Sequence, residues 1–163
     1  MDRYSEVTNK NQREIVLLKA FPCKWGKCSF CDYILDNSND EEEINKLNFE
    51  VLENITGKYK VLEVINSGSC FEIPKATLLK IKEIVKEKKI ERLFFESHWI
   101  YKKKIQQMRD FFDIPITFKI GVETFDYDFR NNFLNKNAKF ETVEELKKYF
   151  DSPCIMVGIK GQT

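Results

Sequence analysis

Apolar positions follow two different periods along this chain. Short, nearly continuous apolar runs predict buried strands, and the first of these runs is Ile15 to Leu18. Between the runs, apolar residues recur every three or four positions, which predicts helices that bury one face. The predicted strands span residues 14–20, 60–65, 90–95, 114–121 and 154–158.

Start and stop signals delimit the predicted helices. Asn39 with Glu42 three residues later forms a capping-box pattern that opens a first helix, and Gly57 closes it. Pro74 opens a second helix, whose C-terminal lysines suit the negative end of the helix dipole. Further helical segments are predicted over 101–112, 129–133 and 142–150.

Strands that alternate with helices predict a parallel sheet with right-handed crossovers. The chain of 163 residues is long enough for one domain with a real core, so residues 1–163 are expected to form a single domain. It holds about five strand-helix units, and no helix follows the last predicted strand. A bare apolar edge strand is an aggregation hazard. We therefore expect that the chain is truncated or that another chain covers this edge.

Charge and targeting signals narrow the functional classes. The 27 basic and 26 acidic residues give a formal charge of +1, which argues against a dedicated polyanion binder. The runs Glu41 to Glu43 and Lys102 to Lys104 fit solvated helix faces, although the lysines could contact RNA phosphates. The sequence shows no signal peptide and no apolar stretch of membrane length, so a cytoplasmic location is expected.

Three cysteines are the most informative chemical feature. Cys23, Cys28 and Cys31 have the spacing C-x4-C-x2-C and follow the first predicted strand. Three thiolates from one loop can hold three corners of a metal centre. Structural zinc sites and electron-transfer clusters normally have four protein ligands. The absent fourth ligand therefore indicates an open coordination position for a cofactor or substrate.

Other interpretations of the five cysteines remain open. A zinc site could take His98 or Cys70 as its fourth ligand. A plant-type 2Fe-2S cluster has the same initial spacing and a later cysteine, for which Cys70 is available. Either case would make the protein a metal or redox module without chemistry of its own. Cys154 lies in an apolar run and fits a small buried hydrophobe.

Polar residues follow each predicted strand. Folds built from parallel strands place their chemistry on the loops at the carboxyl ends of the strands, so these residues are expected to gather at one rim. Besides the cysteines they are Asn66, Ser67, Gly68, Ser69, Glu96, Ser97, His98, Glu123, Thr124, Lys160, Gly161 and Gln162.

The cysteine loop, with Phe30 directly before the last cysteine, resembles that of the radical S-adenosylmethionine (SAM) superfamily. The usual spacing there is C-x3-C-x2-C, so this loop is one residue longer. The resemblance implies a partial (βα) barrel, a 4Fe-4S cluster on Cys23, Cys28 and Cys31, and an open iron for SAM. The implied SAM-binding residues are Phe30, Asn66, Ser67, Gly68, Ser69, Glu123, Arg130, Gly158 and Lys160.

Roles are implied for some of these residues. Ser67 to Ser69 stands where the superfamily has a turn for the methionine amine, and Glu123 where a carboxylate meets the ribose or methionine end. Gly158 to Gly161 resembles the turn beside adenine, and Arg130 is a candidate for the methionine carboxylate. A flavodoxin or ferredoxin would supply electrons.

Within the superfamily, the stretch Lys27 to Asn37 and the short chain resemble the small queuine lyases of queuosine salvage. The implied reaction is radical cleavage of queuine, a 7-deazaguanine base, to 7-aminomethyl-7-deazaguanine. Glu96 and His98 are the expected catalytic residues. Glu96 or Asp32 would accept the N–H edge of the base, His98 and Asn66 would contact the diol, and Phe71 or Trp99 would stack on the ring. The alternative is a related radical SAM enzyme that acts on tRNA. The nearly neutral net charge of the protein disfavours tRNA as the substrate.

Overall fold

The computed structural model describes residues 2–162, in which six strands form one sheet in the sequential order β1 to β6. The first pair is antiparallel and the other four neighbouring pairs are parallel. The strands are β1 (Tyr4–Val7), β2 (Arg13–Leu18), β3 (Val61–Asn66), β4 (Arg92–Glu96), β5 (Ile116–Glu123) and β6 (Ser152–Ile155). The expected mixed α/β architecture is confirmed.

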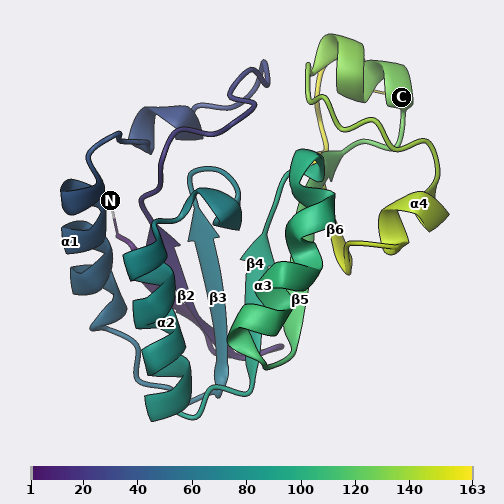
Figure 1. The fold of residues 1–163 in the computed structure, drawn as a ribbon. Helices are drawn as coiled ribbons and strands as arrows, with labels where there is room; N and C mark the ends of the chain where they lie inside the picture. Colours follow the sequence, from purple (N-terminus) through teal and green to yellow (C-terminus); the bar gives the residue numbers. More distant parts are fainter. Residues whose placement is uncertain (1, 163) are drawn as a thin grey trace.

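Helices connect the parallel strands and lie on one side of the sheet (Figure 1). This follows from the sequential strand order, because right-handed crossovers that always step in one direction place every helix on the same face. The helical elements are η1 (Tyr33–Asp36), α1 (Glu41–Leu52), η2 (Cys70–Glu72), α2 (Lys75–Glu87), η3 (Trp99–Lys104), α3 (Ile105–Phe112), η4 (Phe129–Phe133) and α4 (Val143–Lys147).

The core lies between the sheet and these helices. Alternate strand residues such as Val16 and Leu18 of β2 are fully buried, and a strand turns every second side chain to one face. The same face of the sheet carries Leu62, Val64, Leu93, Phe95, Phe118 and Ile120. Helix residues at three- and four-residue spacing, Ile81, Ile84 and Val85 among them, pack onto it.

The first helix begins one residue later than the capping pattern predicts. Asp40, not Asn39, is its N-cap: the Asp40 carboxylate accepts from the Glu43 backbone N–H at 3.0 Å. The helix ends at Leu52, ahead of Gly57. The Gly57 N–H donates to the buried Glu14 carboxylate at 2.8 Å, and Gly57 has a φ of 76° that favours glycine.

Three further features differ from the sequence-based expectation. The strand β1 was not predicted; it pairs with β2 over Tyr4 to Val7. Residues 101–112 divide into the 3₁₀ helix η3 and the α-helix α3, and α4 is shorter than the predicted 142–150. Phe129 and Phe133 do share a helical turn and stack at 4.7 Å between ring centroids. Among the described residues, no helix combines the length and apolar character needed to cross a bilayer.

Candidate functional site

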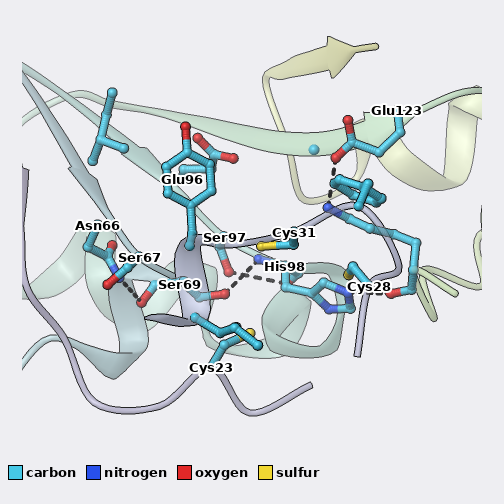
Figure 2. A pocket seen from close by; sticks show the side chains of 17 residues that line it. Cys23, Cys28, Cys31, Asn66, Ser67, Ser69, Glu96, Ser97, His98 and Glu123 are labelled. Carbon is cyan, nitrogen blue, oxygen red and sulfur yellow. Dashed lines mark hydrogen bonds and ion pairs between the residues drawn. The ribbon is translucent and has the colours of Figure 1, made fainter. Parts of the chain in front are cut away.

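A cavity of about 290 Å³ opens at the carboxyl ends of the parallel strands. Figure 2 shows side chains from the cysteine loop, β3, β4 and β5 facing this space. Most residues expected at the rim line it, as strand-end placement predicts. Its lining comprises Cys23, Cys28, Phe30, Cys31, Tyr33, Ile34, Ile65, Asn66, Ser67, Gly68, Ser69, Glu96, Ser97, His98, Gly121, Glu123 and Lys136.

The three cysteines of the loop are free and partly buried, and all three line this cavity. Burial raises the pKa of the Cys23 thiol, and it raises the pKa of Cys28 to about 11. Within residues 2–162, no three His, Cys, Asp or Glu side chains are grouped closely enough to hold a single metal ion. Thiolates that each bind a different iron of one cluster need no such common point.

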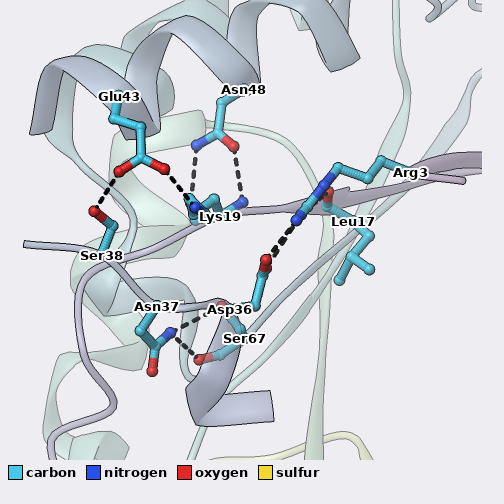
Figure 3. Close-up of polar contacts among 9 residues, drawn as sticks. All are labelled: Arg3, Leu17, Lys19, Asp36, Asn37, Ser38, Glu43, Asn48 and Ser67. Carbon is cyan, nitrogen blue, oxygen red and sulfur yellow. Dashed lines mark hydrogen bonds and ion pairs between the residues drawn. The ribbon is translucent and has the colours of Figure 1, made fainter. Parts of the chain in front are cut away.

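Hydrogen bonds tie one side of the cysteine loop to Asn37 and, through Asn37, to the turn after β3. The Cys23 N–H donates to Asn37 Oδ1 at 3.2 Å, and Asn37 Nδ2 donates to the Ser67 backbone oxygen at 2.7 Å. Arg3 pairs with Asp36 at 2.5 Å in the preceding turn (Figure 3). These contacts join segments that are distant in sequence, so the loop and the Ser67 turn keep a fixed relation.

The other side of the loop is tied to the segment after η4. Trp25 Nε1 donates to the Asn135 backbone oxygen at 2.6 Å, and Asn135 Nδ2 donates back to the Lys27 oxygen at 2.8 Å. Gly26, between them, has a φ of 58° that suits glycine. This pair of contacts holds the four-residue segment between the first two cysteines in a defined turn.

Glu72 links the cysteine loop to the turn after β3. Its buried carboxylate accepts from the Lys24 N–H at 2.8 Å, from the Ser69 N–H at 2.5 Å and from the Tyr101 hydroxyl at 3.1 Å. A Cβ at Gly68 would lie 2.3 Å from Glu72 Oε2, so glycine is required there. Sequence reasoning missed Glu72, although Ser69 with Glu72 three residues later is a capping-box pattern; its contacts with Lys24 and Tyr101 arise only in the fold.

The end of β5 contributes a buried ion pair. Lys136 Nζ donates to Glu123 Oε1 at 2.8 Å, and both side chains are nearly nine-tenths buried. Glu123 has a φ of 65°, which is strained for a residue with a side chain. A Cβ at Gly121 would approach Glu123 Oε1 at 2.5 Å. Lys136 was not predicted, since it follows no strand and no motif marks it.

Two acceptors face the cavity from β3 and β4. Asn66 Nδ2 donates to the Ser69 oxygen at 3.0 Å, which leaves Asn66 Oδ1 buried and without a partner among the described residues. Burial raises the pKa of the Glu96 carboxyl, and no hydrogen bond or ion pair within residues 2–162 reaches its oxygens. A buried acceptor without a partner is costly, so this wall suits a ligand that offers N–H or O–H donors.

His98 is held by backbone groups on both ring nitrogens. Nδ1 accepts from the Ile100 N–H at 3.1 Å, and Nε2 lies 2.6 Å from the Lys136 oxygen, to which it donates in the matching neutral tautomer. Burial is the main reason that the pKa of His98 falls to about 4. The residue caps η3. Neither ring nitrogen is left to contact a ligand, which corrects the expectation of a catalytic His98.

We expect the low pKa of His98 to make stability pH-dependent. The unfolded histidine binds a proton below about pH 6.5, but the folded one does so only below about pH 4. The unfolded state therefore holds more protons in this window, and the free energy of unfolding should fall as pH decreases, by up to about 1.4 kcal/mol per pH unit. Urea titrations across the window measure the slope.

His98 is the only histidine in the sequence, so the variant His98→Gln isolates its share. The variant should show a shallower slope than the parent protein over the same pH range. Equal slopes would mean that the pKa of His98 is not lowered in the folded protein.

Arg130 does not line the cavity. It is 1% exposed, and its guanidinium donates to the backbone oxygens of Ala138, Thr124 and Phe140 at 2.9, 3.0 and 2.6 Å. Three of its five N–H donors are engaged and the side chain is buried away from the cavity, so the expected contact with the methionine carboxylate is wrong. The cation that does face the cavity is Lys136.

Other expected residues also lie away from the cavity. Gly158 and Lys160 are exposed beyond β6, and Asp32 is exposed outside the lining. Trp99 packs against Phe140 in the core at 5.3 Å between rings. Phe71 likewise packs against another ring, that of Tyr101, so the aromatic side chains lining the cavity are Phe30 and Tyr33 instead.

The chain is similar to two known proteins. No family model matches the chain. An uncharacterized protein of Methanocaldococcus jannaschii is 26% identical over 167 aligned residues, which cover 90% of this chain and 44% of that protein. The chain thus spans less than half the length of this curated relative. A solved structure, "queuine lyase from Clostridium spiroforme bound to SAM and queuine", is 59% identical with a TM-score of 0.98.

That match covers 100% of this chain and 71% of the solved chain. A mostly parallel α/β fold with a three-cysteine loop at its strand ends, together with this match, defines a protein of the radical SAM class. Within this class, the chain belongs to the queuine lyase family.

Proposed function

We propose that this protein cleaves queuine to 7-aminomethyl-7-deazaguanine, using a 4Fe-4S cluster and SAM, and so serves queuosine salvage. The whole-chain match to a queuine lyase bound to SAM and queuine carries the proposal. The cavity at the strand ends supports it, since the cysteines and the polar turns after β3, β4 and β5 all face one space. In this proposal residues 1–163 form one core domain, and β2 to β6 are part of a (βα) barrel.

Cys23, Cys28 and Cys31 fit the role of cluster ligands. They are free, they come from one loop, and both sides of that loop are anchored by hydrogen bonds to the body of the protein. When bound, the cluster and SAM supply an electron and the means to abstract a hydrogen atom from the substrate. The chain itself must hold the substrate beside that chemistry and keep water out.

The turn after β3 and the Glu123–Lys136 pair suit the two ends of SAM. The turn after β3 lies directly beside the cysteine loop, where Ser67, Gly68 and Ser69 can accept hydrogen bonds from the methionine amine. Glu123 can accept from the ribose hydroxyls, and Lys136 replaces Arg130 as the cation for the methionine carboxylate. Phe30 contacts the same region, because Lys136 Nζ lies 5.4 Å from its ring centroid.

Glu96 and Asn66 suit the substrate. The guanine-like edge of queuine presents N–H donors, and its side arm carries hydroxyl donors. Glu96 is expected to accept from the base edge, and Asn66 Oδ1 from a hydroxyl or amine of the bound ligands. Each contact would give a partner to an acceptor that otherwise has none.

Free queuine, rather than tRNA, is the expected substrate. Reduced protein given SAM and queuine should form 5'-deoxyadenosine and 7-aminomethyl-7-deazaguanine, whereas queuosine-containing tRNA should be inert, because a protein of net charge +1 attracts a polyanion weakly. Mass spectrometry of both reactions gives the answer. Product from tRNA alone, or none from queuine with a full cluster, would refute the proposal.

The variant Glu96→Ala tests whether Glu96 accepts hydrogen bonds from the base. Removal of the Glu96 carboxylate should leave the N–H groups of queuine unpaired and weaken queuine binding by about 1 to 3 kcal/mol. Cluster content and SAM affinity should not change. Calorimetric titration with queuine measures the loss, and unchanged queuine affinity would show that Glu96 does not contact the base.

A further inference from the structure

The pairing of β4 with β5 places Lys119 directly opposite Glu96. Side chains of cross-strand partners lie on the same face of the sheet, and opposite charges there attract each other. Lys119 does not pair with Glu96, however. Its Nζ donates to Glu63 Oε1 at 2.5 Å instead, one strand further along the sheet.

Glu63 receives a second cation from the other side. Arg13 Nε on β2 donates to Glu63 Oε2 at 2.5 Å, so both carboxylate oxygens of Glu63 are engaged. The Glu63 side chain is only 3% exposed. Burial alone would raise its pKa, but the hydrogen bonds from Lys119 and Arg13 outweigh that effect and hold the pKa below its usual value.

The side chains of Arg13, Glu63, Glu96 and Lys119 lie on the face of the sheet opposite the helices. Glu63 is the Cα partner of Phe94, and Glu96 stands two residues beyond Phe94, so Glu63, Glu96 and Lys119 point to the same side. Glu96 lines the cavity, whereas Glu63 and Lys119 do not. The ion pair therefore lies behind the residue that faces the ligand.

We propose that Glu63 is a positioning residue that holds Lys119 away from Glu96 and thereby keeps the Glu96 carboxylate free for the substrate. The inference rests on the proposed function, in which Glu96 accepts from the N–H edge of queuine. Without Glu63, Lys119 loses its partner and pairs with the carboxylate of Glu96, its cross-strand neighbour. A Glu96 that is already paired with an ammonium group offers fewer acceptor sites to the base.

Three variants test this assignment through queuine binding, measured by calorimetry on protein that carries its cluster and SAM. Glu63→Gln should weaken queuine binding about tenfold or more. Lys119→Met should bind like the parent protein, because Glu96 stays unpaired and Arg13 still pairs with Glu63. The double variant Glu63→Gln with Lys119→Met should recover the lost affinity. A purely structural role of Glu63 would give no such recovery.

One control variant and one charge-conserving variant complete the test. Glu6→Gln breaks another lysine–glutamate pair, with Lys58 at 2.7 Å, and should leave queuine binding unchanged. If Glu63→Gln does not fold, Glu63→Asp keeps the charge; its shorter side chain cannot reach both cations, so binding should again weaken and again recover with Lys119→Met.

Equal queuine affinity in Glu63→Gln and parent, or a loss in Lys119→Met as large as in Glu63→Gln, would overturn the inference. Absence of queuine binding in the parent protein would instead refute the proposed function itself.

Discussion

Replacing Cys23, Cys28 or Cys31 with serine will abolish the iron-sulfur cluster. Protein prepared without oxygen should carry about four irons per chain, and each single variant should lose nearly all of them, because a cubane held by only two thiolates and a hard hydroxyl is poorly retained. The proposed lyase activity should vanish with the iron. Iron analysis and the cluster absorbance measure the change.

The remaining two cysteines provide the controls. Cys70 is fully buried in the core, so Cys70→Ala removes its thiol without leaving a buried hydroxyl unpaired. Cys154, on β6, is partly exposed, so Cys154→Ser should be tolerated. Both variants should keep a full cluster. Loss of iron in Cys70→Ala, or zinc in place of iron in the parent protein, would contradict an open three-cysteine cluster.

Arg130→Met should destabilise the protein by about 3 to 5 kcal/mol. The substitution keeps most of the apolar stem but leaves three buried backbone oxygens, those of Thr124, Ala138 and Phe140, without their donors. It also removes the guanidinium from the face of the Phe140 ring, 3.8 Å from the centroid. Urea unfolding of the parent and the variant gives the difference.

Arg92→Met is the matched control. Arg92 is exposed, and its guanidinium donates to the Thr117 hydroxyl at 3.2 Å on the surface. Its loss should change the free energy of unfolding by no more than about 0.5 kcal/mol. If Arg130→Met were equally mild and instead weakened SAM binding, Arg130 would have to contact the cofactor after all.

Most residues expected at the strand ends do line the cavity, whereas Thr124 and the residues beyond β6, Lys160 to Gln162, do not. The cysteine loop, the Asn66 to Ser69 turn, Glu96 and Glu123 all line it. This success has a local cause: apolar runs reveal where strands end, and parallel strands present all their carboxyl ends at one edge. The same pattern could not reveal Lys136, which reaches the cavity from a segment between elements.

The sequence by itself determined the alternating α/β organisation, the family resemblance and the three cysteine ligands expected for the cluster, because these depend on short-range periodicity and spacing. The tertiary structure decided which polar groups are free. His98 and Arg130 are occupied by backbone partners, and Lys119 is diverted from Glu96 by Glu63, a residue 56 positions away in the chain. Lys136 lies 38 positions from His98, and such distant partners meet only when the sheet has formed. The partners of Arg130 lie within ten positions, but on a loop whose path no local pattern encodes.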